Sequence, residues 1–215
     1  MLQHIPKGIA KASEASGSRG ILLQDHFGKR VHFLLRGKLL PYLMRISRAA
    51  QMGGLPKRGT DLATLLVRSH VHMCEAQNRA AGALFLDLVG AFDRVHRSIY
   101  TIDTWSPTEL ADFFESTGLE AEHLEAFLDL ASLNALDDAA VPDHLKALVK
   151  VAYSNSWFTT EGLSTLTCTG AGTRPGEHLG DPLFNFVMAT IMTDVHETLG
   201  AHDILLDIPL VESAL

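Results

Sequence analysis

The sequence predicts a mixed α+β (α/β) fold. Segments with apolar residues at helical spacing alternate with short runs that are rich in β-branched and aromatic residues. Stretches rich in Gly, Pro and Ser separate the two kinds of segment. The chain has 215 residues, of which 47% are hydrophobic and 20% charged. Such a chain is long enough for one large domain or two small lobes.

In the first part of the chain, a loose N-terminus is expected to be followed by a short strand and a helix. Residues 1–18 are small and polar and predict a loose N-terminus. R-G-I-L-L at 19–23 predicts a short strand. Apolar residues at helical spacing predict a helix over 29–46, with a break near Gly37 or Pro41 because proline lacks the N–H that an interior helical residue donates.

A second helix and a buried strand are expected next. Thr60 can cap a helix that reaches about Arg79, with Leu62, Leu65, Leu66 and Met73 turned inward. A-L-F-L-D-L at 83–88 is continuously apolar apart from one aspartate. This composition predicts a strand that is buried on both faces.

The second half of the chain carries clearer boundary signals. S-P-T-E at 106–109 is a capping box with proline at the first helical position, and Gly118 is expected to end that helix. Another helix is predicted over 141–153, and a hairpin over 156–170 with its turn near Glu161-Gly162. A long amphipathic helix is predicted from Asp181-Pro182 to Gly200.

The net charge of −7 is distributed unevenly. Residues 1–60 hold eleven Lys and Arg against two acidic residues, a net charge of +9. The rest of the chain holds seven basic and 23 acidic residues, a net charge of −16. A basic first quarter on an acidic body indicates either a surface that meets phosphates or a solvated basic face.

Several classes of protein are disfavoured by composition. Cys74 and Cys168 lie far apart without a C-x-x-C pattern, so neither a disulfide framework nor a zinc knuckle is expected. The eleven histidines are scattered. The start lacks the apolar core of a secretory signal, and no apolar run reaches the roughly 18 residues of a membrane span. An intracellular protein without a membrane partner is therefore expected.

Asp87 is the most unusual residue of the apolar run. It ends the predicted strand, where α/β proteins commonly place ligand-binding groups, and a carboxylate there can hold a hard divalent cation. Phe92 follows five residues later and would lie beside whatever that cation binds. Taken alone, the pattern also allows Asp87 as a helix cap and Phe92 as ordinary core.

F-L-D-L-V-G-A-F-D-R-V-H-R at 85–97 resembles motif A of reverse transcriptases, especially those of non-LTR (LINE-type) retrotransposons. The resemblance implies that Asp87 binds both catalytic Mg²⁺ ions and that the carbonyl of Leu88 assists one of them. It further implies that Phe92 is the gate that excludes a ribose 2′-hydroxyl, while Asp93 is structural.

Upstream segments are similar to the fingers of the same family. Arg19 and Lys29, ten residues apart, match a pattern that implies a clamp on the incoming deoxynucleoside triphosphate. Such a polyanion needs fixed cations. Q-M-G-G-L-P-K-R-G-T at 51–60 resembles the stretch before motif A, with Gln51, Gly54 and Thr60 in place.

Downstream, P-G-E-H-L-G-D-P-L-F-N at 175–185 resembles motif B, and two registers compete. G-D-P-L at 180–183 is the direct string match, whereas the family spacing counted back from Phe184-Asn185 places the flexible glycine at Gly176. We take the second register, so that Gly176 lies near the template–nucleotide pair. Glu177 and His178 then replace the Asp and Pro of the family.

Motif C, with its Asp-Asp pair, is missing. Asp137-Asp138 is the one Asp-Asp of the sequence; it precedes motif B and has no strand signal around it, so a loop or cap is expected. The resemblance therefore implies a partial right-hand polymerase, with a small sheet covered by helices, that is truncated before motif C. Its fingers-like region would span 19–80 and its incomplete palm 81–215, with motif A at 84–97 and motif B at 174–189.

The expected function is that of a reverse transcriptase fragment. The implied activity is RNA-templated DNA synthesis from dNTPs, with Mg²⁺ as cofactor and an RNA template and DNA primer as partners. Two-metal catalysis needs more carboxylates than Asp87 alone, so the chain is expected to be inactive by itself. The alternatives are a non-catalytic nucleic-acid-binding remnant and an unrelated acidic interaction domain.

Overall fold

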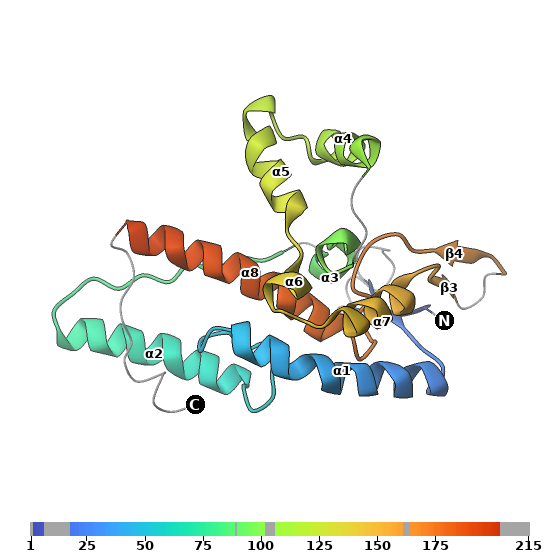
Figure 1. The fold of residues 1–215 in the computed structure, drawn as a ribbon. Coiled ribbons are helices and arrows are strands. Elements are labelled where there is room, and N and C mark those ends of the chain that lie inside the picture. Colours follow the sequence, from blue (N-terminus) through green and yellow to red (C-terminus); the bar gives the residue numbers. More distant parts are fainter. Residues whose placement is uncertain (1, 7–17, 89, 102–105, 161–163, 203–215) are drawn as a thin grey trace.

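The computed structural model describes residues 2–6, 18–88, 90–101, 106–160 and 164–202 (Figure 1). The described part is an α+β structure in which helices dominate and the strands form two separate antiparallel pairs. The helices are α1 (His26–Ile46), α2 (Thr60–Ala76), α3 (Ala91–Arg94), η3 (Arg97–Ile99), α4 (Pro107–Thr117), η4 (Ala121–His123), α5 (Leu124–Ser132), α6 (Ala135–Asp138), α7 (Asp143–Tyr153) and α8 (Gly180–Ala201). The strands are β1 (Leu2–Pro6), β2 (Ser18–Leu22), β3 (Trp157–Thr159) and β4 (Leu166–Cys168).

The hydrophobic core lies where α1, α7 and α8 meet. Each helix contributes residues three or four positions apart, which places them on one face. Leu39, Val149, Leu183 and Phe186 are completely buried. In α8 the burial is confined to the first half, because Ile191 and Val195 are exposed. The predicted helices at 141–153 and 181–200 are thus confirmed, but the C-terminal half of α8 contributes little to the core.

Helix α1 is continuous, so the predicted break near Gly37 or Pro41 is wrong. Asp25 caps the helix by accepting a hydrogen bond from the Gly28 N–H at 2.8 Å. Proline inside a helix costs about 3 kcal/mol. Leu39 and Leu43, on either side of Pro41, are completely buried, and their burial offsets that cost.

The strands form two hairpin-like pairs. β1 pairs with β2, with Leu2 opposite Leu22, and β3 pairs with β4, with Trp157 opposite Cys168. The predicted strand at 19–23 and the predicted hairpin at 156–170 are confirmed. The loose terminus expected over residues 1–18 is wrong for β1, because its backbone groups form hydrogen bonds with β2. Residues 7–17 and the predicted turn at Glu161-Gly162 lie outside the described residues.

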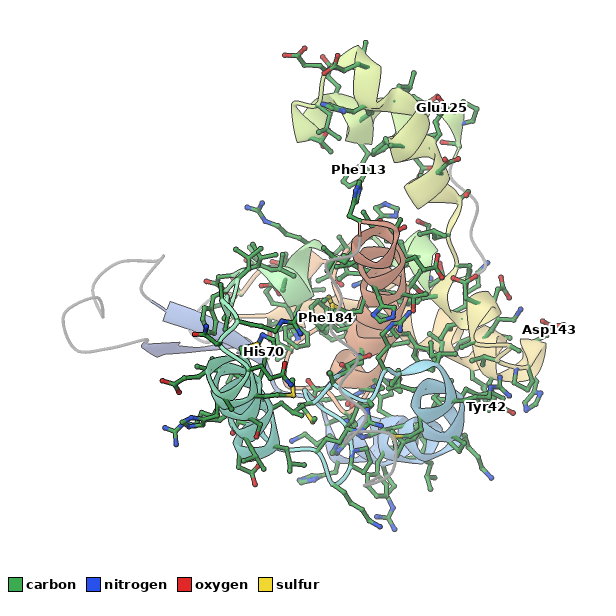
Figure 2. All side chains as sticks on the ribbon, turned by 90° about the vertical axis from the view of Figure 1, so that its left-hand side faces the viewer. Tyr42, His70, Phe113, Glu125, Asp143 and Phe184 are labelled. Carbon is green, nitrogen blue, oxygen red and sulfur yellow. The ribbon has the colours of Figure 1, made fainter. Side chains whose placement is uncertain are left out.

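Helices α4 and α5 project from the rest of the molecule (Figures 1 and 2). The predicted capping box is present: the Glu109 N–H donates to Ser106 Oγ, and the Ser106 N–H donates to the Glu109 carboxylate at 3.0 Å. Gly118 ends α4 with φ of 68°. Phe113 and Phe114 contact Phe127 of α5, so aromatic rings hold this pair together.

Helix α2 extends over most of its predicted range. It begins at Thr60, with Gly59 rather than Thr60 at the N-cap position and no side-chain cap. Leu65 is 59% exposed, contrary to its predicted inward position, while Cys74 is buried. No helix among the described residues is long and apolar enough to cross a membrane.

The predicted buried strand at 83–88 is wrong. Residues 79–88 are neither helix nor strand, and Leu84, Phe85 and Leu86 are each more than 80% exposed. A strand needs a neighbour to satisfy its backbone N–H and C=O groups, and no described strand pairs with this run. The composition identified the apolar run, but it could not show whether a neighbouring strand is available to pair with it.

This exposed run predicts self-association. Contiguous exposed apolar side chains promote non-specific contacts between molecules. We expect the double variant Leu84→Ser/Phe85→Asp to increase the monomer fraction in size-exclusion chromatography severalfold over the unmodified chain. The control is Leu148→Ser/Val151→Asp, which removes two exposed apolar residues from α7, where they are not part of such a run. Equal monomer fractions for all three proteins would contradict the prediction.

Candidate functional site

Segments that are distant in sequence meet at the N-terminal end of α8. The loop before α2 is tied there by Gln51, whose Nε2 donates to Asn185 Oδ1 at 3.0 Å and to the Asn185 carbonyl at 3.2 Å. Gly54 approaches the same side chain so closely that an added Cβ would lie 2.6 Å from Asn185 Nδ2. Two residues singled out by the resemblance, Gln51 and Gly54, therefore contact Asn185 of the motif B segment.

Strand β2 is joined to the turn before α8. The Leu22 N–H donates to the Pro175 carbonyl at 3.1 Å. Gly176 has φ of +98°, which favours glycine, and a Cβ there would lie 2.7 Å from Ile21 Cγ2 and 2.9 Å from the Leu22 carbonyl oxygen. Gly176 thus lies in the turn against β2, whereas Gly180 begins α8.

Phe92 connects the motif A segment to the same place. Its ring lies 4.6 Å from the ring of Phe184, centroid to centroid. Figure 2 labels Phe184 near the middle of the view. The Thr173 N–H donates to the Phe92 carbonyl at 2.7 Å, and the Gly172 N–H to the Val95 carbonyl at 2.8 Å. The ring that the resemblance marks as a nucleotide gate packs here on an aromatic residue of α8.

A buried arginine holds the loop between β4 and α8 in place through hydrogen bonds. Arg97 is 8% exposed, and its guanidinium donates to the carbonyls of Tyr153, Thr169, Ala171 and Gly172 over 2.8–3.3 Å. It also donates to the hydroxyls of Ser156 and Thr169. Burial lowers the pKa of Arg97 from its ordinary value. Sequence reasoning did not single out this residue, because nothing near it in the sequence shows that its partners are distant carbonyls.

Glu177 is a departure from the motif B pattern, and its side chain is only 6% exposed and is paired. Its carboxylate lies 3.0 Å from Arg174 Nη2 and 3.4 Å from His32 Nδ1 of α1. The Arg174 guanidinium lies over the Tyr153 ring, 4.2 Å from its centroid. Burial raises the pKa of the Tyr153 hydroxyl, which donates to the Thr173 carbonyl at 2.9 Å. Glu177 therefore links α1 to the loop before α8.

Basic and aromatic groups gather at the start of α1. Lys29 lines a cavity of about 350 Å³ together with Arg30, Phe33 and His178. The Phe33 ring meets His178 edge-on at 5.6 Å and lies 6.0 Å from the Arg30 guanidinium. Phe33 is 51% exposed, and the neighbouring Phe27 is 80% exposed. Arg19 lies in β2, and its side chain is outside the described residues.

The predicted metal ligands are exposed and do not belong to a helix or strand. Asp87 and Leu88 are exposed in the run without secondary structure, and no described residue forms an ion pair or hydrogen bond with the Asp87 carboxylate. Within the described ranges, no three His, Cys, Asp or Glu side chains are arranged to hold a metal ion. Asp137 and Asp138 lie in α6, and Asp137 pairs with Lys146. These donors do not fit a pair of Mg²⁺ ions, so no catalytic step follows from them.

Comparisons with family models, curated proteins and solved structures found no significant match to this chain.

Proposed function

We propose that this chain is a nucleic-acid-binding module of the reverse transcriptase type, corresponding to fingers and the front of a palm, which does not polymerise DNA by itself. The observation that carries the proposal is the meeting of β2, the Gln51–Gly54 loop, α3 and the motif B segment at the start of α8. The resemblance marks all four segments, and a chance resemblance would not require them to be neighbours.

The basic start of α1 supports nucleic acid as the partner. Lys29 and Arg30 lie beside two exposed phenylalanines, Phe27 and Phe33. Cations attract the phosphate backbone, and exposed aromatic rings offer faces on which bases stack. The +9 charge of residues 1–60 extends this positive potential beyond the cavity.

A purely non-catalytic module is the second candidate, and the position of Asp87 favours it. A polymerase needs this carboxylate beside further acidic ligands, but in the described part of the chain it is exposed and belongs to no group of three or more possible metal ligands. The gene can discriminate the two candidates. An aromatic-x-Asp-Asp within a few dozen codons downstream of Leu215, in any frame, favours the polymerase fragment, and its absence favours the binding module.

Binding is expected to be electrostatic. We expect the double reversal Lys29→Glu/Arg30→Glu to weaken binding of a fluorescent RNA–DNA hybrid by about tenfold or more, because two phosphate contacts are lost and two carboxylates repel the strand. The affinity of the unmodified chain should fall steeply between 50 and 200 mM salt, by about tenfold or more. Fluorescence anisotropy at several salt concentrations measures both effects.

The control is Arg68→Glu/Arg79→Glu, which changes the net charge equally but lies on α2 and just after it. We expect it to weaken binding much less than the α1 reversal. If the two reversals weaken binding equally, or if the affinity does not change with salt concentration, the assignment of the interface to α1 is wrong.

A further inference from the structure

The cavity at the start of α1 combines positive charge with aromatic rings. Lys29 and Arg30 line it together with Phe33 and His178. Its volume of about 350 Å³ is close to the lower limit of pockets that bind small ligands. None of its described lining residues is acidic. The cavity is therefore suited to a group that is both anionic and aromatic, as one unit of a nucleic acid strand is.

The two cations of this cavity are available to an anion. Among the described residues, neither the Lys29 ammonium nor the Arg30 guanidinium forms an ion pair or a hydrogen bond. The Arg30 guanidinium instead lies 6.0 Å from the centroid of the Phe33 ring. Asp25, the acidic residue nearest to them in the sequence, is the N-cap of α1, and its carboxylate accepts the Gly28 N–H. Phosphate groups can therefore approach both cations.

Two phenylalanine rings beside these cations are exposed. Phe27 is 80% exposed and Phe33 is 51% exposed, although another face of the same helix is buried in the core. Phe33 meets His178 edge-on, whereas no aromatic ring of the described residues contacts Phe27. Aromatic rings beside cations are typical of surfaces that bind single strands, because the bases stack on the rings while the cations attract the phosphates. Both rings therefore offer stacking surfaces for bases.

The spacing of the two rings favours an unpaired strand. Phe27 and Phe33 are six residues apart in α1, which separates them by about 9 Å along the helix axis. The bases of a duplex are stacked about 3.4 Å apart, and their faces are covered by their neighbours. A duplex can therefore offer phosphates to the cations but no base faces to the rings. A single strand can separate its bases and offer both.

We propose that the start of α1 binds unpaired nucleotides of a nucleic acid strand, with bases stacked on Phe27 and Phe33 and phosphates held by Lys29 and Arg30. The inference rests on the proposed function, in which α1 forms the nucleic-acid interface, and it adds the form of strand that this interface takes. The cations contribute to the binding of any strand, whereas the rings contribute only where bases are unpaired. These two contributions can be measured separately.

Fluorescence anisotropy of the full chain with three labelled probes of equal length tests the inference. The probes are oligo(dA), an abasic strand that has the same phosphates without bases, and a blunt-ended RNA–DNA hybrid. We expect oligo(dA) to bind about tenfold more tightly than the abasic strand at the same salt concentration. The two single strands carry the same charge, so the difference measures the contribution of the bases alone.

The double variant Phe27→Leu/Phe33→Leu keeps apolar side chains but removes the rings. We expect it to weaken oligo(dA) binding by about tenfold and to abolish the difference between oligo(dA) and the abasic strand. Binding of the hybrid should change by less than about twofold, which also shows that the variant is folded. The matched control is Phe85→Leu, whose ring is 83% exposed in the run at 83–88, and it should bind all three probes as the unmodified chain does.

The outcomes separate this inference from the function on which it rests. If no probe binds, or if Lys29→Glu/Arg30→Glu weakens no probe, the proposed function fails and the inference fails with it. If binding depends on these two cations but is equal for oligo(dA) and the abasic strand, only the inference is overturned. Equal oligo(dA) affinities for Phe27→Leu/Phe33→Leu and Phe85→Leu would also overturn it, and would assign the exposed rings of α1 to a protein partner.

Discussion

Replacing Arg97 by methionine is expected to lower the free energy of unfolding by about 3–4 kcal/mol. The substitution removes the hydrogen bonds that the guanidinium donates to the carbonyls of Tyr153, Thr169, Ala171 and Gly172. The Gly172 carbonyl keeps the Tyr100 hydroxyl as a donor. Methionine fills much of the volume and removes the cost of burying a charge, which keeps the loss from being larger. Urea denaturation followed by circular dichroism measures the change.

The control for this variant is Arg94→Met, three residues earlier. Arg94 is exposed, and we expect its replacement to change stability by no more than about 0.5 kcal/mol. Similar stabilities for the two variants would show that Arg97 does not hold the loop between β4 and α8 in place.

Replacing Gly176 by alanine is expected to cost about 2–3 kcal/mol of folding stability. The positive φ of this residue disfavours any side chain, and the added Cβ would lie 2.9 Å from the Leu22 carbonyl oxygen, a backbone atom that cannot turn away. The strand β2 must then separate from the turn before α8. We expect a lower urea midpoint together with faster amide hydrogen exchange at Leu22, whose N–H donates to Pro175.

Gly170→Ala is the matched control, because Gly170 has no positive φ and no atom within 4 Å of an added Cβ. It should leave stability within about 0.5 kcal/mol of the unmodified chain. If Gly176→Ala is as stable as Gly170→Ala, the close approach of β2 to this turn does not form in solution.

Local signals predicted local structure well. The capping box at Ser106–Glu109, the C-terminal Gly118 and the paired runs around β3 and β4 depend on residues a few positions apart, and all three are present. The predicted break at Pro41 failed because tertiary burial of α1 outweighs a local preference. The predicted strand at 83–88 failed because strand formation depends on a partner that no local pattern encodes.

The candidate site was predictable only in part for the same reason. Phe92 and Gly176 were named from the sequence: the Phe92 ring packs on Phe184 of α8, and Gly176 lies in the turn before that helix. Lys29 lies on α1 beside His178. Asp87 and Leu88, named with them, are exposed in a segment without helix or strand. Long-range contacts explain what was missed: the partners of Arg97 come 56 to 75 residues later in the chain.

The central claim is that this chain binds nucleic acid but does not extend a primer by itself. Primer extension on poly(rA)·oligo(dT) with dTTP and either Mg²⁺ or Mn²⁺, performed at a protein concentration where a gel shift shows the primer–template bound, tests both halves together. We expect a shifted primer–template and no incorporation above background, because no group of three or more His, Cys, Asp or Glu side chains among the described residues is arranged to hold a metal ion. Incorporation that disappears in Asp87→Ala would contradict the account, and so would the absence of any shift at low salt.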